Sequence, residues 1–396
     1  MSIINHGFKI IVFLFFAYVF WSLNQYYVPQ SDEAKQINST KTLLNSGTYT
    51  LKHSFLELTD LRGKDFNLSK EEIFLLQDFS FVQVRNTSFP LGYSIAVASL
   101  VKLGLSLEDA VKIFRLLGIG LVLLTSIILA SNFLTNKILK LVFVSLNFSF
   151  AVMYSFTSVT DTWILGLFMS SVLILYKLRT KTHNESLLIF LLSLTSSIMV
   201  LLKYTSIPIV ASLFFFLLIK RWSSGYSSIL KIISLFIPAT SFVLISLYFN
   251  YVEIGSISSN IVSNIQPKID YSFLLKIWEL PVNFFQEIFI LPRFVHALLA
   301  QPGTFHIVTS PLFFLMGAYI IFFSASNFKE DDIINRDFSI IFLIAFLNIF
   351  IFLFLITLIY LGNENSFIPV TYGRYYFVLG VLFLIKVFRK FDKAIL

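Results

Sequence analysis

Apolar runs of about 20 residues, separated by short polar connections, recur along most of this chain. An α-helix rises about 1.5 Å per residue, so such a run matches the hydrocarbon core of a bilayer, which is about 30 Å thick. Because lipid offers no hydrogen-bonding partners, each span must satisfy its own backbone groups as a helix. The pattern therefore predicts an all-α polytopic membrane protein.

The composition agrees with this class. Hydrophobic residues make up 57% of the 396 positions, and the mean hydropathy is +0.81, which soluble domains rarely reach. The first apolar run is followed by aromatic residues instead of a small-residue cleavage site, so we interpret it as an uncleaved anchor. We predict one integral-membrane domain over 1–396, with about ten transmembrane helices. These spans are 8–24, 115–133, 138–157, 161–178, 186–203, 204–220, 231–250, 305–324, 338–361 and 374–388.

Two further apolar stretches are not counted as spans. The stretch 90–105 is short and carries Lys102, and the stretch 280–299 is interrupted by Pro281 and Pro292. Proline removes a backbone donor and breaks a helix. We expect both stretches to lie at the outer membrane interface.

The positive-inside rule sets the orientation. With a cytoplasmic start, 15 Lys and Arg residues fall on the inner side, and 5 fall outside beyond the first long loop. If 90–105 crossed the membrane, all later loops would change sides and this bias would reverse. Two large external loops follow, at 25–114 and 251–304. The net charge of +8 is thereby explained by topology and does not indicate nucleic-acid binding.

The first external loop opens with two adjacent acids, Asp32 and Glu33, followed by a helix-like run and a turn at 46–47. Near its end, Ser106 precedes two acidic residues, a pattern typical of the capped start of a helix. We predict such a helix over 106–114, and external juxtamembrane helices elsewhere in the loop, at 70–79 and 91–103.

Three acidic residues are candidates for chemistry. Asp32 and Glu33 come just after the first span, where a carboxylate could accept a proton from a sugar hydroxyl while a lipid-linked donor stays in the membrane. The alternative is a solvated acidic pair. Asp161 begins the fourth span at its outer end, where it could bind a sugar hydroxyl or a metal. The alternative for Asp161 is a helix cap.

Three basic residues stand out because this topology otherwise avoids external charge. Arg115, Lys203 and Arg374 lie at outer helix ends, where a phosphate at the bilayer surface would explain them. The alternative is that their side chains extend to the lipid headgroups.

Other chemistries have little support in the sequence. With no cysteine there is no disulfide, thiolate nucleophile or Cys-zinc site. His53, His296 and His306 are too widely spaced to suggest a zinc site. There is no Gly-rich phosphate loop.

Five stretches, taken in order, resemble the GT-C glycosyltransferases, among them the dolichyl- and undecaprenyl-phosphate-dependent mannosyl- and arabinosyltransferases. The resemblance covers most of the chain by layout and these short stretches by motif. They are 32-DEAKQINSTKTLLNSGTY-49, 90-PLGYSIAVASLVKLGLSLEDAVKIFRLLG-118, 160-TDTWILG-166, 201-LLKYTSIP-208 and 373-GRYYFVLG-380. The chain departs from the family at Gln36, where a tyrosine is common, and in having only Pro90 where two prolines are usual. It also lacks a large soluble C-terminal domain.

The resemblance implies an inverting hexosyl- or pentosyltransferase that moves a sugar from a polyprenyl-phosphate donor to a hydroxyl of a lipid, glycan or protein. Asp32 or Glu33 would be the base, and Asp161 would orient the acceptor or a metal. Arg115, Lys203, Arg374 and Tyr375 would bind the donor phosphate and sugar. No cofactor is certain, and a divalent metal is left open. The expected location is the bacterial cytoplasmic membrane, with the site on the external face and no nucleic-acid partner.

Two rival functions stay open. An O-antigen or polysaccharide polymerase or ligase is also a membrane protein with lipid-linked substrates, but typically carries its main external loop late in the chain. A transporter or flippase for lipid-linked sugars would place ionisable residues or broken helices at mid-membrane.

Overall fold

A computed structural model describes residues 31–47, 50–54, 81–85, 90–180, 185–221, 333–360 and 378–395, with individual residues between 230 and 248. Helices account for 93% of the interpretable residues. The elements are α2 (Ser31–Ser46), β1 (Thr50–Ser54), β2 (Phe81–Arg85), α5 (Gly92–Lys102), α6 (Leu107–Phe133), α7 (Lys137–Thr157), α8 (Val159–Thr180), α9 (Glu185–Leu202), the 3₁₀ turn η1 (Tyr204–Ser206), α10 (Ile207–Arg221), α16 (Ile333–Tyr360) and α18 (Leu379–Ile395).

Three helices in the described part of the chain are long and apolar enough to cross a membrane. They are α6, residues Val159–Arg179 of α8, and α9. They coincide with the predicted spans 115–133, 161–178 and 186–203, so the prediction of apolar helices long enough to span a membrane is confirmed there. Helices α7, α10, α16 and α18 cover the predicted spans 138–157, 204–220, 338–361 and 374–388 in whole or in part. The spans 8–24 and 305–324 and the external loop 251–304 lie outside the described residues, and only individual residues of 231–250 are described.

Helix α6 corrects one boundary. The predicted helix 106–114 and the predicted span 115–133 form a single helix of 27 residues, Leu107–Phe133. Its predicted cap is confirmed, because the Ser106 hydroxyl accepts a hydrogen bond from the Asp109 amide at 3.1 Å. No helix-breaking residue separates the two segments, so the helix continues from the cap into the apolar run.

Helix α5 confirms that 90–105 contains a short helix. It has 11 residues, too few for a span. Tyr93, Ser94, Val97 and Ala98 are buried, a spacing that places them on one face of the helix.

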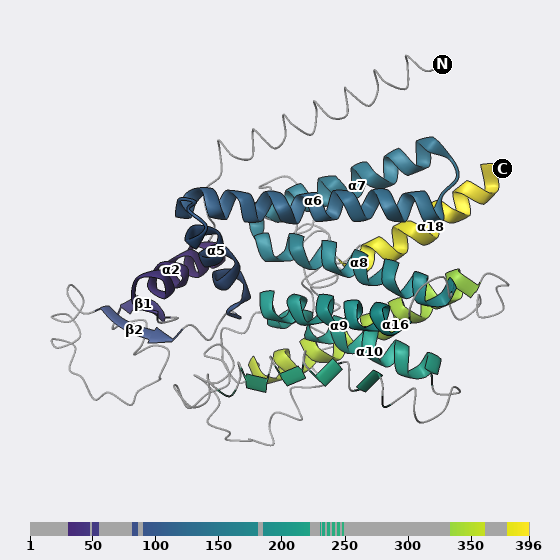
Figure 1. Cartoon of the computed structure of the whole chain (residues 1–396). Coiled ribbons are helices and arrows are strands. Elements are labelled where there is room, and N and C mark those ends of the chain that lie inside the picture. Colours follow the sequence, from purple (N-terminus) through teal and green to yellow (C-terminus); the bar gives the residue numbers. More distant parts are fainter. Residues whose placement is uncertain are drawn as a thin grey trace, which may run out of the picture.

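The helices lie beside one another in a bundle (Figure 1). Helix α6 packs against α7 and α8, α8 packs against α9, and α10 packs against α16. Helices α2 and α5 and the strands gather at one end, beside the start of α6, whereas α18 ends at the opposite side of the bundle. The bundle therefore has two distinct ends, and the sequence candidates on described helices can be assigned to them.

Strands β1 and β2 were not predicted. They pair antiparallel, with Thr50 opposite Arg85 and Ser54 opposite Phe81. Apolar and polar residues alternate over the last four residues of Phe81–Arg85, a pattern typical of a half-buried strand, but so short a stretch is a weak signal beside the long apolar runs. The predicted turn after α2 is confirmed, since Gly47 has φ +72° and glycine adopts this conformation without strain.

The end of the bundle opposite α2 is held by polar contacts. Asp337 at the start of α16 forms ion pairs with Lys220 of α10 and Arg179 of α8. Asp392 in α18 accepts hydrogen bonds from the backbone amides of Thr135 and Asn136, at 2.6 and 2.8 Å, in the turn between α6 and α7. Residues predicted to face the cytoplasm gather at this end: Lys137, Lys140, Lys177, Arg179, Lys220, Arg221, Arg336, Lys386, Arg389, Lys390 and Lys393.

The Asp392 contact gives a pH-dependent stability. Burial favours the neutral acid, but hydrogen bonds from Thr135 and Asn136 outweigh it and hold the pKa of Asp392 below its ordinary 3.8. A lowered pKa contributes stability that is present above the ordinary value and is lost as the pH falls through the folded value. We expect Asp392→Asn to lower the free energy of unfolding by about 1–2 kcal/mol at pH 7. Thermal unfolding in detergent should show this difference shrinking in acid, and an unchanged difference would contradict the assignment.

Candidate functional site

The acidic candidate Glu33 forms a buried ion pair with the basic candidate Arg115. Arg115 Nη2 donates to Glu33 Oε1 at 3.1 Å, joining α6 to the first turn of α2. The Glu33 side chain is 3% exposed and that of Arg115 is 1% exposed. The solvated-pair alternative is therefore wrong for Glu33, and extension to the lipid headgroups is wrong for Arg115.

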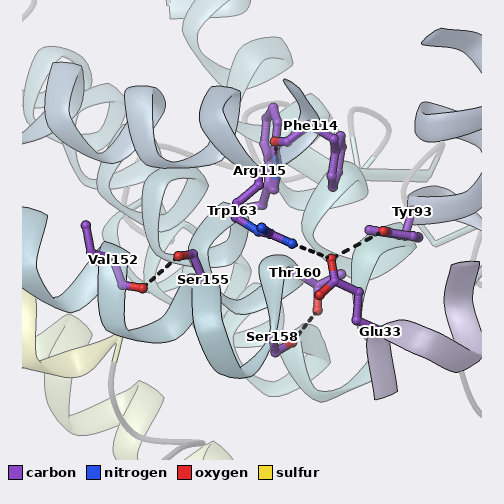
Figure 2. A network of polar contacts seen from close by, with 9 residues as sticks. All are labelled: Glu33, Tyr93, Phe114, Arg115, Val152, Ser155, Ser158, Thr160 and Trp163. Carbon is purple, nitrogen blue, oxygen red and sulfur yellow. Dashed lines mark hydrogen bonds and ion pairs between the residues drawn. The ribbon is translucent and has the colours of Figure 1, made fainter. Parts of the chain in front are cut away.

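Tyr93 of α5 approaches the same carboxylate oxygen. Its hydroxyl lies 3.5 Å from Glu33 Oε1, at the outer limit of a hydrogen bond. Figure 2 shows Arg115 and Tyr93 reaching this oxygen from different helices. Burial raises the pKa of Glu33 above its ordinary 4.5 even though the charge and hydrogen bond of Arg115 lower it. Burial also raises the pKa of Tyr93 well above 10.0, so its hydroxyl stays protonated and can donate.

A polar face of α2 explains how Glu33 is placed. Glu33, Gln36 and Thr40 are all buried, at a spacing that puts them on one side of a helix. The Thr40 hydroxyl donates to Ser94 Oγ at 2.9 Å, and Ser94 Oγ donates to the Gln36 carbonyl at 3.3 Å. Helix α2 therefore binds α5 through hydroxyl groups, with Glu33 about two turns before Thr40.

The other two described candidates also pair with each other. Lys203 Nζ donates to Asp161 Oδ1 at 2.5 Å, with side chains 14% and 3% exposed. Lys203 follows the last residue of α9. Asp161 lies in the first turn of α8, which begins at Val159. Asp161 is thus inside the helix instead of at its cap position, and its carboxylate contacts a cation.

Aromatic contacts connect the start of α8 to the Glu33–Arg115 pair. Trp163, two residues after Asp161, donates its indole N–H to the Phe114 carbonyl at 3.0 Å, and the two rings stack with centroids 4.9 Å apart. Phe114 in turn meets the Tyr93 ring edge-on at 5.3 Å. Figure 2 shows these side chains in one network with Arg115.

Helix α5 makes a second connection, through Gly92. A Cβ atom at Gly92 would lie 2.4 Å from the Leu201 carbonyl oxygen in α9, so the two backbones are in direct contact. Leu201 is two residues before Lys203, and Gly92 is next to Tyr93. Both ion pairs therefore belong to one packed end of the bundle, the end that carries α2.

This contact predicts a strong effect of Gly92→Ala. The added methyl group meets backbone, which cannot rotate away, so α5 must move from α9. Overpacking of this kind costs about 1–3 kcal/mol, and we expect both a lower unfolding temperature and lower activity. Gly120→Ala is the matched control, because its Cβ would meet nothing within 4 Å. Equal melting curves for the two variants would contradict the contact.

Some candidates lie beyond the described residues. Arg374 and Tyr375 are outside them, as is the side chain of Asp32, whose backbone is the second residue of α2. Within the described part of the chain, no three His, Asp or Glu side chains gather in a way that could hold a metal. Tyr93 and Trp163 were not singled out, although both stand in stretches quoted for the resemblance. An aromatic residue in an apolar run is an ordinary packing residue, so nothing in the sequence pattern distinguished these two from the other aromatic residues.

The sequence matches no protein-family model, and no curated protein or solved structure gave a significant match. Function must therefore be inferred from the chemistry of the site. Two carboxylates and two cations from α2, α6, α8 and the end of α9 lie at one end of the bundle. Such a site can position a hydroxyl compound and bind an anionic group at a membrane surface.

Proposed function

We propose that this protein is a membrane glycosyltransferase that uses a polyprenyl-phosphate-linked sugar, with a GT-C-like fold of about ten spans. One observation carries the proposal. Four of the residues expected in the site, from distant parts of the chain, form two ion pairs at one end of the bundle: Glu33 with Arg115, and Asp161 with Lys203. A site for an anionic donor and a hydroxyl acceptor requires side chains of both signs, and these two pairs supply them at the end of the bundle that carries α2.

The proposed reaction is a single inverting displacement. The acceptor hydroxyl oxygen attacks the anomeric carbon as the bond from that carbon to the phosphate oxygen breaks. Asp32 takes the hydroxyl proton, and Asp161 orients the acceptor. Lys203, with Arg374 and Tyr375, binds the departing polyprenyl phosphate, whose negative charge a cation stabilises. The acceptor is a lipid, glycan or protein on the external face of a bacterial cytoplasmic membrane.

The transporter alternative has less support. Transport paths are marked by ionisable residues near mid-membrane. The sequences 116–133, 162–176 and 186–202, which form most of the three candidate spans, contain no charged residue. The charged side chains of these helices lie instead outside these apolar stretches, as a reaction at the membrane surface would need. A polymerase or ligase differs from our proposal in donor and acceptor, and the assay below separates them.

Transfer by the purified protein tests the proposal. The protein in liposomes is given synthetic polyprenyl-phosphate hexoses and pentoses, with an envelope extract from a deletion strain as acceptor. Mass spectrometry should detect one added sugar and free polyprenyl phosphate. Uptake of the donor without a covalent product would favour the transporter. Transfer only from diphosphate-linked oligosaccharides would favour the polymerase or ligase.

The proposed topology can be tested with single cysteines, because the chain has none of its own. Asn45→Cys in α2 and Ser256→Cys in the second loop should react with a membrane-impermeant thiol reagent in spheroplasts. Lys137→Cys, at the start of α7, should react only after permeabilisation. Asn45 and Lys137 are both exposed, so burial does not explain a difference. The reverse pattern would contradict the ten-span topology.

A further inference from the structure

We infer that the Glu33–Arg115 ion pair positions helix α2, and that Arg115 is a positioning residue and not a ligand for the donor phosphate. This inference rests on the proposed function and deepens it. According to this inference, Glu33 and Arg115 hold the site in its shape, whereas the other charged residues of the site contact substrate.

The two ion pairs differ in how far the side chain of the cation is exposed to solvent. The Arg115 side chain is 1% exposed and its partner Glu33 is 3% exposed, so a phosphate could reach this guanidinium only if α2 moved away. Lys203 is 14% exposed and lies just after the last residue of a helix, so it is the more accessible of the two cations. Of the two cations, Lys203 is the one suited to bind a substrate phosphate.

Arg115 lies where the helices α5, α6 and α8 pack tightly together. Phe114, the preceding residue, is in contact with both Tyr93 and Trp163. The adjacent turn of α6 is equally tight, since a Cβ at Gly118 would lie 2.9 Å from the Trp163 ring. The guanidinium thus leaves α6 at a point fixed by α5 and α8, and it holds Glu33 of α2 at that point.

The same pair fixes the position of Asp32, because Asp32 and Glu33 are consecutive residues of α2. Helix α2 binds α5 through hydroxyl contacts, and the contact with Arg115 fastens its first turn to α6. Burial raises the pKa of Glu33 despite the ion pair, and the side chains of both partners are almost fully removed from water. Such pairs can often be replaced by neutral groups with little loss of stability, whereas removing one partner is costly.

The test compares single and double variants of the full-length protein in the transfer assay. Glu33→Gln and Arg115→Met should each lower the unfolding temperature, and each should reduce kcat of the folded fraction by about 10- to 100-fold through misplacement of α2. The donor KM should stay within about threefold of wild type, because no phosphate contact is lost. The double variant should recover both the unfolding temperature and most of kcat, since Tyr93 can still donate to the introduced amide.

Two controls accompany these variants. Arg115→Lys keeps a cation beside Glu33 and should partly restore kcat over Arg115→Met. Glu108→Gln removes an exposed ion pair from the same helix, since the side chain of Glu108 is 78% exposed, and should change nothing measurable.

Three outcomes would overturn the inference. A donor KM raised tenfold or more by Arg115→Met would make Arg115 a phosphate ligand, since such a rise reports the loss of a charged contact with the donor. A stable double variant without activity would make Glu33 the base. If Glu33→Gln and Arg115→Met each kept the wild-type kcat and stability, the ion pair would have no role in positioning α2. Each of these requires an active wild type, whereas an inactive wild type would overturn the proposed function instead.

Discussion

Asp32→Asn is expected to reduce sugar transfer by about 10²- to 10⁴-fold, the usual contribution of a general base. The amide is nearly isosteric with the carboxylate but cannot take the acceptor proton. Stability should be unchanged, because the contact that fastens the first turn of α2 is made by the next residue, Glu33, with Arg115. This combination of full stability and lost turnover distinguishes a base from a structural acid.

The measurement is turnover of purified Asp32→Asn with a synthetic polyprenyl-phosphate sugar, with thermal unfolding followed in parallel. Asn45→Gln serves as the control, since Asn45 is an exposed polar residue of the same helix. If Asp32→Asn keeps near-full turnover while Glu33→Gln alone abolishes it in folded protein, the two acids have exchanged roles. If neither matters, the transferase proposal fails.

Lys203→Met should have the second largest effect, and it should combine two losses. It takes the cation from beside Asp161, a carboxylate with only 3% exposure, which for a buried pair costs about 3–5 kcal/mol. It also removes a cation proposed to bind the donor phosphate, so the donor KM should rise. Lys203→Arg keeps the charge and should retain partial activity.

Thermal unfolding and donor titration separate these two losses. Asp161→Asn combined with Lys203→Met should recover stability, because neither charge remains, while the raised donor KM persists. Lys112→Gln is the control, a lysine in an ion pair with Glu108 on the surface of α6, worth at most about 1 kcal/mol. A donor KM equal to wild type in Lys203→Met would leave Lys203 with a purely structural role.

Several features of the fold follow from local sequence. The apolar runs of α6, α8 and α9 are long enough to cross a bilayer, and in lipid the backbone must form a helix whatever its propensity. The cap at Ser106 and the turn at Gly47 also follow from local chemistry, since a hydroxyl accepts a backbone amide and glycine tolerates a positive φ. Local sequence did not predict that one helix runs through residue 115, although nothing in the sequence ends the helix there. It also did not predict the short strands β1 and β2.

The sequence by itself determined that this chain forms apolar helices of membrane length, and it indicated which charged residues are unusual for their position. Only the tertiary structure decided how those residues combine. Glu33 and Arg115 are 82 positions apart, and Asp161 and Lys203 are 42 apart. The first pairing depends on how α5 fits between its neighbours, with Gly92 against α9 and Tyr93 against Glu33, and the second depends on the packing of α8 against α9. Such fits arise from side-chain volumes packed across helices, and no spacing along a single segment encodes them.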